Sequence, residues 1–240
     1  MHSRHSEHSP ASLKARVPER RMRQHLMRGA ACSIALLLAA LSPNVSAQAQ
    51  QGWFCGPLEA GYGPFDYRTT PYEKREVVER FHFTPSVKAL TRGQSSGQVG
   101  GDIAYTLHAF PNHPAALDAM ARLGRKERSP QPRGARYTVE CYFERAIRFA
   151  PDDPQVRVLY AHYLVGEKRR DEARRQLEAG EQSPEKTAAL LYNLGLGFAD
   201  VGEYEKSLGY AHQAYAAGIE LPGLRERLRR AGKWRDERKE

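Results

Sequence analysis

The sequence predicts an all-α protein in which pairs of short helices stack side by side, preceded by an irregular N-terminal arm. Within residues 188–218, Leu191, Leu194 and Phe198 recur at spacings of three and four, which puts them on one face of a helix. Gly202 then marks a turn, and a second helix follows with its own inward stripe. Neither helix can bury its apolar face alone, so the pair needs similar neighbours on both sides.

Two earlier stretches repeat the pattern. After Pro114 the inward stripe includes Leu117 and Met120, and after Pro154 it includes Tyr160 and Leu164. The unit that starts at Pro154 is 34 residues long, and the one that starts at Pro114 is 40 residues long, because it holds an additional polar loop. Three successive units of similar length favour a row of helical hairpins.

The unit at residues 188–219 carries the most specific pattern. Its members are Leu191, Tyr192, Asn193, Leu194, Gly195, Phe198, Gly202, Tyr204 and Ala214. This pattern resembles that of a tetratricopeptide repeat, with Ser207 where the family usually has Ala, and the match is weaker in the other units. The 34-residue period is also that of the family. The resemblance implies a tetratricopeptide-type α-solenoid that binds proteins or peptides.

These patterns divide the chain into three parts. Residues 1–47 are predicted to be a signal peptide, 48–101 an irregular arm, and 102–240 the solenoid. Within the solenoid we expect a helix at 102–110 that completes a half repeat, repeats at 114–150, 154–184 and 188–219, and a capping helix at 222–235. A terminal helix with a polar outer face is what the open end of a solenoid needs.

The arm is rich in glycine, proline and aromatic residues, which mark turns and argue against plain disorder. Within it we expect a helix at 72–80 with Val77 and Val78 inward, an extended piece at Phe81–Phe83, a helix from Pro85 to Thr91 with Thr84 as its cap, and a loop at 92–101. Its aromatic rings either cover the end of the solenoid or form a ligand surface. A further alternative is that the arm fills the solenoid's own groove.

Residues 1–47 have the organisation of a secretory signal. Four arginines between Arg20 and Arg28 precede the uncharged apolar run Gly29–Leu41, and the small residues Val45 and Ala47 stand at the −3 and −1 positions of a cleavage site. The apolar run is shorter than the roughly 20 residues that span a bilayer, which disfavours an uncleaved anchor. We therefore expect cleavage after Ala47 and a periplasmic or secreted protein.

The charge distribution argues against nucleic acid as a partner. The chain has a formal net charge of +9, but residues 1–47 hold seven Lys or Arg and two Asp or Glu. More than half of the positive excess therefore lies in the segment that we expect to be removed. The remaining charge is small for a domain of this size, and no stable membrane span is predicted in the mature chain.

The cysteines fit an exported protein. Cys32 lies within the predicted signal, which leaves Cys55 and Cys141. An even pair in an oxidising compartment predicts a disulfide, and two unpaired buried thiols are the alternative.

No known catalytic, metal or cofactor motif is found in the sequence. A helix break at Pro111 separates His108 from His113, so they do not form a helical metal pair. Asp152 and Asp153 sit in a turn, where carboxylates cap helices more often than they catalyse. We therefore predict a protein that is not an enzyme and that needs no cofactor or metal.

A surface is the expected site, because the family resemblance implies that the first helix of each repeat lines a concave groove. The positions that would face this groove are Asp118, Arg122, Val158, His162, Tyr192, Asn193 and Leu196. Asn193 matches a family position that often bonds a peptide backbone, since an amide both donates and accepts. Arg122 is suited to pairing with a carboxylate.

The leading hypothesis is a periplasmic adaptor of a Gram-negative cell envelope that presents this groove to a protein or peptide partner. One alternative is an envelope enzyme with an active site in the arm, around Asp66, Tyr67, Arg68 and His82. Another is a binder of anionic glycan or lipid headgroups through the arginine-rich end, Arg225–Arg235, where a solvated helix face is the simpler interpretation.

Overall fold

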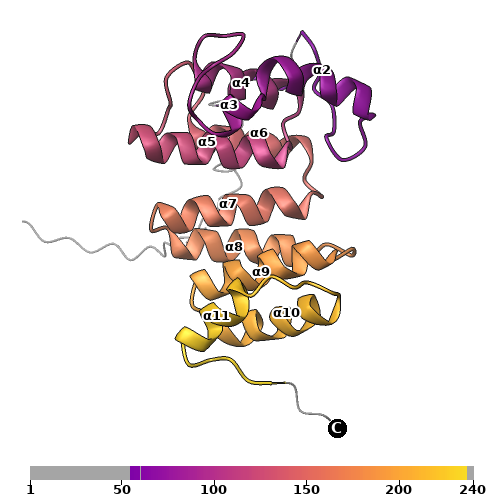
Figure 1. Ribbon diagram of the computed structural model, residues 1–240, viewed down its shortest axis with the longest axis vertical. Helices are drawn as coiled ribbons and strands as arrows, with labels where there is room; N and C mark the ends of the chain where they lie inside the picture. Colours follow the sequence, from indigo (N-terminus) through magenta and orange to yellow (C-terminus); the bar gives the residue numbers. More distant parts are fainter. Residues whose placement is uncertain (1–54, 60, 237–240) are drawn as a thin grey trace, which may run out of the picture. The chain divides into compact units, whose positions relative to one another are not determined.

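A computed structural model describes residues 55–59 and 61–236 of the chain (Figure 1). Within these ranges the chain forms ten helices and no β-strand, which confirms the all-α prediction. The helices are α2 (Tyr72–His82), α3 (Pro85–Lys88), α4 (Val99–Ala109), α5 (Pro114–Glu127), α6 (Val139–Phe149), α7 (Pro154–Gly166), α8 (Arg170–Glu181), α9 (Ala188–Asp200), α10 (Tyr204–Ala216) and α11 (Gly223–Arg230). None of them combines the length and apolar character needed to cross a bilayer.

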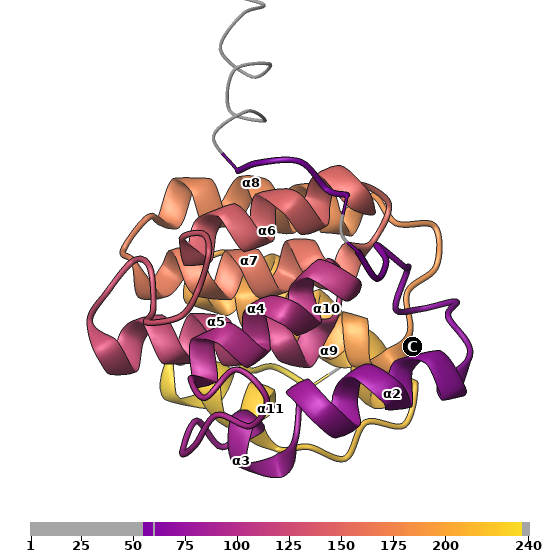
Figure 2. The same ribbon diagram turned by 90° about the horizontal axis from the view of Figure 1, so that it is seen from above.

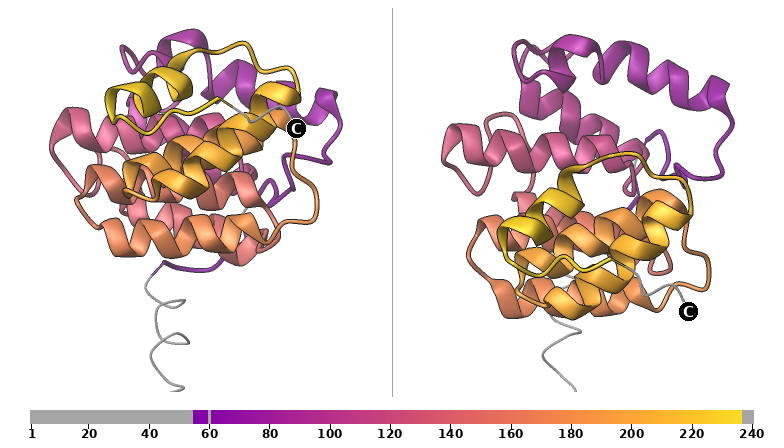
Figure 3. Two further views of the ribbon diagram at one scale, coloured as in Figure 1. Left: turned by 90° about the horizontal axis from the view of Figure 1, so that it is seen from below. Right: turned by 60° about the horizontal axis from the view of Figure 1, so that its bottom comes forward.

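The helices pack as consecutive pairs. α5 packs against α6, α7 against α8 and α9 against α10, and the first helices of the pairs contact one another in the order α5, α7, α9, α11 (Figure 1). Figure 2 shows α6 and α8 on one side of these first helices, away from α2 and α3. At the other end of the chain α11 packs on both α9 and α10 (Figure 3).

The predicted inward stripes form the core. Leu117 and Met120 of α5, Leu164 of α7 and Leu194 of α9 are at most 1% exposed. These side chains belong to one continuous buried cluster that runs from α3 to α11. Burying a side chain of this size contributes about 1.5–3 kcal/mol, so the stacking of pairs supplies the stability that single hairpins lack.

Two glycines of α9 allow neighbouring helices to approach closely. A Cβ on Gly195 would lie 2.5 Å from Cδ2 of Leu224, and one on Gly197 would lie 2.5 Å from Cδ2 of Leu177. The carbonyl oxygen of Gly195 also accepts the Ser207 hydroxyl at 2.7 Å. A side chain at either glycine would push α11 or α8 outward, because 2.5 Å is well inside van der Waals contact.

The first helix is longer than predicted, and it turns a different side inward. α2 continues through His82, so the extended piece predicted at Phe81–Phe83 is wrong. Val78 is buried at 2% exposure, but Val77 is 45% exposed, which corrects the prediction that both face inward. Val77 and Val78 point about 100° apart around the helix axis, and α4 covers only the Val78 side of α2. Phe83, at 1% exposure, supplies the apolar contact after the helix ends.

The loop predicted at 92–101 ends earlier, because α4 begins at Val99. The carboxylate of Asp102 is fully buried and accepts the backbone N–H of Gln94 at 2.5 Å and of Ser96 at 3.0 Å, which folds the loop back over the helix start. Gly100, expected in the loop, instead lies in the helix, where a Cβ would come 2.3 Å from the Arg133 carbonyl oxygen. This close approach explains why a glycine stands inside a helix.

The capping helix is shorter than the predicted 222–235. α11 ends at Arg230, and Gly232 follows with a φ of +66°. The N–H of Lys233 returns to the carbonyl oxygen of Leu228 at 2.8 Å, a glycine-based helix stop. Leu224 and Leu228 are fully buried, and Trp234 packs against the same core from outside the helix.

The described part of the arm is fastened to α6. The sulfur atoms of Cys55 and Cys141 lie 2.16 Å apart, at disulfide distance, and the pair joins residues separated by 86 positions. Arg145 of α6, 2% exposed, donates to the carbonyl oxygens of Cys55 at 2.9 Å and Pro57 at 2.5 Å. The predicted signal peptide at residues 1–47 and its cleavage site lie outside the described residues.

Further along, the arm covers the turn after α4. The N–H of Phe65 donates to the Ala109 carbonyl oxygen at 2.8 Å, and the rings of Phe65 and Tyr67 pack on Phe110 with centroids 6.0 and 5.9 Å away. These two rings therefore pack on the chain's own core beside Phe110. Tyr62 stays 37% exposed.

Candidate functional site

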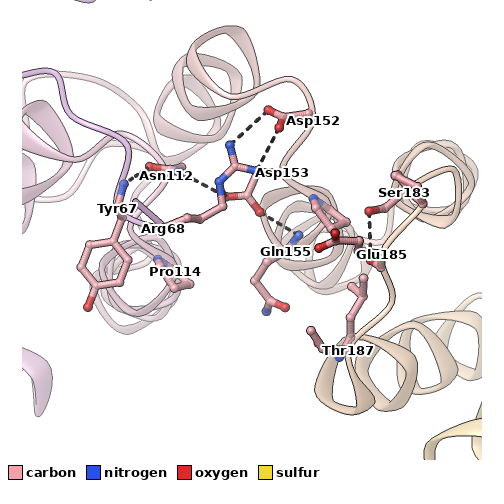
Figure 4. A pocket seen from close by; sticks show the side chains of 13 residues that line it. Tyr67, Arg68, Asn112, Pro114, Asp152, Asp153, Gln155, Ser183, Glu185 and Thr187 are labelled. Carbon is pink, nitrogen blue, oxygen red and sulfur yellow. Dashed lines mark hydrogen bonds and ion pairs between the residues drawn. The ribbon is translucent and has the colours of Figure 1, made fainter. Parts of the chain in front are cut away.

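A cleft of about 480 Å³ lies where the arm meets the N-terminal ends of α5, α7 and α9 (Figure 4). Its apolar wall includes Pro114, Pro154 and Leu190, one residue from each of the three helices. Polar side chains reach it from the arm, with Arg68, and from the turn before α9, with Glu185. Because each wall comes from a different helical pair, the cleft exists only when the pairs stack.

Each of the three helices begins at the cleft with a residue that caps its first turn. The caps are His113, Asp153 and Thr187, and each accepts a backbone N–H of its own helix. Pro114 and Pro154 follow at the first helical position, where the missing N–H costs no hydrogen bond. The predicted capping role is thus confirmed for Asp153. The sequence places these helix starts at one edge because the pairs repeat in register.

Asn112 connects the arm to the turn before α7. Its side chain is 1% exposed, and its amide nitrogen donates to Asp66 at 2.8 Å and to Asp153 at 2.9 Å. Its amide oxygen accepts the N–H of Tyr67 at 2.9 Å. An amide suits this position because it donates and accepts at once. The whole amide is satisfied, so Asn112 holds one wall of the cleft in place.

Arg68 lies among three carboxylates at the mouth of the cleft. Its guanidinium is 2.6 Å from Asp66 Oδ2, 3.1 Å from Asp152 Oδ2 and 3.7 Å from Asp153 Oδ2. The hydrogen bonds from Arg68 and Asn112 hold the pKa of Asp66 at about 2, against the opposing effect of burial. The same carboxylates raise the pKa of Arg68. Asp66, Asp152 and Arg68 are therefore charged at neutral pH.

Tyr67 reaches away from Arg68 to a second polar group. Its hydroxyl donates to Glu79 Oε1 at 2.9 Å, and its ring stacks on His113 with centroids 4.0 Å apart. His113 Nε2 is 3.6 Å from the same carboxylate oxygen, and the nearby His113 ring together with the Tyr67 hydrogen bond lowers the pKa of Glu79 to about 2. Burial lowers the pKa of His113, so the ring is neutral at pH 7. This group ties α2 to the start of α5.

The lining of the cleft carries more negative than positive charge. Arg68 is its basic residue, while Asp152, Asp153 and Glu185 are acidic. Asp152 is 73% exposed and Glu185 lies at the surface, so both carboxylates are accessible to an incoming group. The Ser183 hydroxyl donates to the Glu185 carbonyl oxygen at 3.0 Å and so stabilises the turn (Figure 4). Such a cleft suits a segment that brings a cationic side chain beside an apolar one.

The residues predicted for the concave groove are distributed between the surface and the core. Asp118 and Arg122 of α5 pair at 2.7 Å on a half-buried surface, and Arg122 also donates to the Lys88 carbonyl oxygen of α3 at 3.1 Å. His162 of α7 is half-buried, with Nδ1 3.6 Å from Oδ2 of Asp200. These three side chains lie on the first helices, as expected, but already have partners within the chain.

Two of the groove residues are core residues. Val158 is fully buried, close to Gly180 of α8. Tyr192 is 8% exposed, and its hydroxyl accepts the N–H of Leu224, 3.2 Å away, because α11 continues the row of first helices and covers it. Neither presents an open surface, which corrects their assignment. Asn193 and Leu196 are half-buried on α9.

The residues of the enzyme hypothesis fall into two places. Asp66, Tyr67 and Arg68 belong to the polar network at the cleft. His82 instead pairs with buried Asp102, with Nδ1 3.1 Å from Oδ1, beside a separate hollow of about 240 Å³. The structure therefore does not gather the four residues into one arrangement. Among the described residues there is no group of three His, Cys, Asp or Glu side chains suited to holding a metal ion.

At the basic C-terminal end, several cations have partners within the chain. The Arg225 guanidinium lies 4.6 Å from the Tyr215 ring centroid and 4.9 Å from that of Trp234. Arg227 pairs with Asp200. Arg229 and Arg230 are exposed, as a solvated helix face predicts. Binding of an anionic headgroup here stays a hypothesis.

Sequence reasoning assigned no role to Asn112, which organises the cleft. A signal was present, because Asn112 and Asp152 occupy equivalent turns, each followed by a proline that begins a helix. That equivalence indicates that the two turns lie on the same edge. The equivalence does not predict the path of the arm, which brings Asp66 and Arg68 to these two turns.

Comparison of this chain with known proteins does not identify its family. The sequence matches no protein-family model and no curated protein, and the structure matches no solved structure.

Proposed function

We propose that this chain is a non-catalytic protein-interaction scaffold of the cell envelope, built as a tetratricopeptide-type solenoid. The observation that carries the proposal is the cleft at the starts of α5, α7 and α9, which joins an apolar wall to accessible carboxylates. Support for the solenoid comes from the ordered contacts of α5, α7, α9 and α11 and from the buried stripes at the positions that carry the family resemblance.

The cleft suits recognition better than reaction. The side chains of Asp66, Asn112 and Asp153 are hydrogen-bonded to one another and to Arg68 of the arm. Groups held in this way form a rigid rim, and a rigid rim reduces the entropy that binding costs. Arg68 is held by carboxylates and so is not available to activate a nucleophile or stabilise an oxyanion.

The partner that fits is a protein segment with Lys or Arg next to an apolar residue. The cation would pair with Asp152 or Glu185 at the rim, and the apolar side chain would rest on Pro154 and Leu190. Export of the chain is the context we propose, because a cysteine pair at disulfide distance persists in oxidising compartments.

A photo-crosslinking experiment tests this proposal. A benzophenone amino acid at Gln155, inside the cleft, should trap a discrete partner in cells of the native host, whereas the same group at exposed Gln213 of α10 should not. Because the partner segment is cationic, Asp152→Lys with Glu185→Lys should reduce the adduct several-fold. Glu178→Lys, an exposed charge reversal on α8, is the matched control and should leave it unchanged.

Two results contradict the proposal. One is the absence of any adduct at Gln155, and the other is an adduct that survives the double charge reversal. The thermal unfolding of each variant is measured as well. Because the substitutions are exposed, the free energy of unfolding should stay within about 0.5 kcal/mol of that of the parent chain.

A further inference from the structure

Exposed apolar side chains gather around α2. The large hydrophobic residues that are exposed in the described ranges are Tyr62 (37%), Tyr72 (67%), Val77 (45%), Phe81 (48%), Tyr105 (42%) and Leu221 (58%). All but Leu221 belong to α2, to α4 or to the arm beside them. Tyr62, Val77, Phe81 and Tyr105 also line one hollow of about 240 Å³. A concentration of this kind marks an interaction surface, because single exposed hydrophobes are usually scattered.

α2 has two distinct sides. Val78 and His82 turn toward α4, where His82 stacks on Tyr105 with ring centroids 3.8 Å apart. Val77 and Phe81, four residues apart, lie beside this contact and also line the hollow, whereas Glu73 and Arg80 flank Val77 at spacings of four and three on the outer side; all four are exposed. Figures 1 and 2 show α2 beside α4, with no other described helix on its outer side.

This outer stripe is complementary to itself. When two α2 helices face each other in antiparallel orientation around a two-fold axis at Val77, each Val77 meets its counterpart. Glu73 lies four residues before Val77 and Arg80 three residues after it, on the same flank of the stripe. The two-fold axis therefore brings Glu73 of each copy level with Arg80 of the other, which gives two ion pairs around an apolar centre.

Forming these pairs would displace little within the chain. Arg80 now pairs with Glu76 at 3.5 Å, one helical turn away, and lies 4.9 Å from the Phe81 ring centroid, and its side chain is 61% exposed. Exposed pairs of this kind contribute between zero and about 1 kcal/mol. A Glu73 partner in a drier interface offers Arg80 a stronger interaction, because apolar neighbours exclude water from the pair.

We propose that a second copy of this chain docks on the outer face of α2, giving a two-fold symmetric dimer centred on Val77. The surface is isologous, so the same stripe serves both copies. Dimerisation would give the proposed scaffold two partner clefts per particle. Two linked clefts would bind a bivalent or repeated partner more tightly than one.

Sedimentation equilibrium on the protein expressed from the 240-residue sequence tests the dimer. We expect reversible dimers whose dissociation constant rises by about tenfold or more in Glu73→Arg and in Arg80→Glu, because each places like charges opposite each other. The double variant Glu73→Arg with Arg80→Glu restores opposite charges and should recover dimerisation. Leu221→Glu, at the exposed hydrophobe remote from α2 in the sequence, is the control and should dimerise normally.

The rescue makes the result independent of folding defects, because the double variant carries both substitutions. A protein that is monomeric at concentrations up to about 100 µM overturns the proposal. Dimers that ignore the charge reversals also overturn it. Protection of the cysteine in monomeric Val77→Cys from alkylation would show that another part of the same chain covers the surface, which is again contrary to a second copy.

Discussion

The guanidinium of Arg145 donates to the carbonyl oxygen of Cys55 across 2.9 Å, although the two residues are 90 positions apart. Arg145 is 2% exposed, and the carbonyl oxygens of Gly56 and Pro57 accept from the same nitrogen. Its ring partner is Tyr137, 4.7 Å from the guanidinium carbon. A buried cation is thus stabilised by backbone dipoles and an aromatic face, and it binds the arm beside the cysteine pair.

Replacing Arg145 should therefore release the arm. Arg145→Met keeps most of the volume but leaves the carbonyl oxygens of Cys55 and Pro57 without their donor, so we expect a loss of about 3 kcal/mol in the free energy of unfolding by urea. Arg148→Met is the matched control, because Arg148 donates to Gly56 from an exposed position at 2.6 Å. A loss under about 1 kcal/mol is expected there. Equal effects would show that burial is not the cause.

The cysteine pair should contribute through the loop that it closes. Joining residues separated by 86 positions restricts the unfolded chain, and the chain-entropy model gives about 4 kcal/mol for such a loop. Cys55→Ala with Cys141→Ala should lower the urea midpoint accordingly. Peptide mapping without reduction should yield the two cysteine peptides linked, and recovery of both as free thiols would contradict the bond.

Asp66 should stabilise the arm and Asp152 should not, although both pair with Arg68. Asp66 also accepts from Asn112 and from the Arg68 N–H, whereas Asp152 is 73% exposed. We expect Asp66→Asn to raise hydrogen exchange across residues 64–70, equivalent to about 1–2 kcal/mol of local stability, and Asp152→Asn to change it by under about 0.5 kcal/mol. Because the pKa of Asp66 is lowered to about 2, its contribution is complete above its unfolded pKa and disappears as pH falls toward 2.

His108 should make the protein less stable in mild acid. Burial, together with the charges of Arg145 and Arg136, lowers its pKa from 6.5 to about 4. A folded-state pKa below the unfolded value means that the unfolded chain binds the proton first, so stability is lost as pH falls from about 6.5 to 4. We expect roughly 2 kcal/mol of this loss to disappear in His108→Phe. Parallel stability curves for the two chains between pH 7 and 4 would contradict the assignment.

Two helical glycines should respond oppositely to alanine. A Cβ on Gly209 of α10 meets nothing within 4 Å, so Gly209→Ala should add about 0.5–1 kcal/mol by restricting the unfolded chain. A Cβ on Gly195 would meet Leu224 at 2.5 Å, so Gly195→Ala should lose at least that gain and loosen α11. Thermal unfolding of the two variants distinguishes these outcomes. Stabilisation by both would mean that Leu224 moves aside freely.

Local signals were sufficient for the helices that repeat. Helix starts can be recognised from the sequence because capping depends on a few adjacent residues. The examples are the caps Thr138, Asp153 and Thr187 and the prolines at 114 and 154. The same signals failed around Val99, where α4 begins inside a run of glycines. There the start depends on buried Asp102 drawing back the loop and on the nearby backbone of Arg133, which are contacts that no local pattern encodes.

The candidate site was harder to predict from the sequence than the helices were. The groove positions followed from the helical register, yet α11 covers Tyr192 and α8 covers Val158, and these coverings depend on which helix comes next in space. The cleft depends on Asp66 and Arg68 crossing to the turns at Asn112 and Asp152.

The amino-acid sequence alone therefore determined the helical class and the repeat of helical pairs, because periodicity and turn residues act over short distances, and it indicated the cysteine pair because only two cysteines follow the predicted signal. Only the tertiary structure decided which predicted groove residues are buried, where the arm runs and which face of α2 remains uncovered. Those outcomes depend on contacts between residues far apart in the sequence, such as Tyr192 and Leu224, 32 positions apart, or Cys55 and Arg145, 90 positions apart, and such contacts form only when the chain is folded.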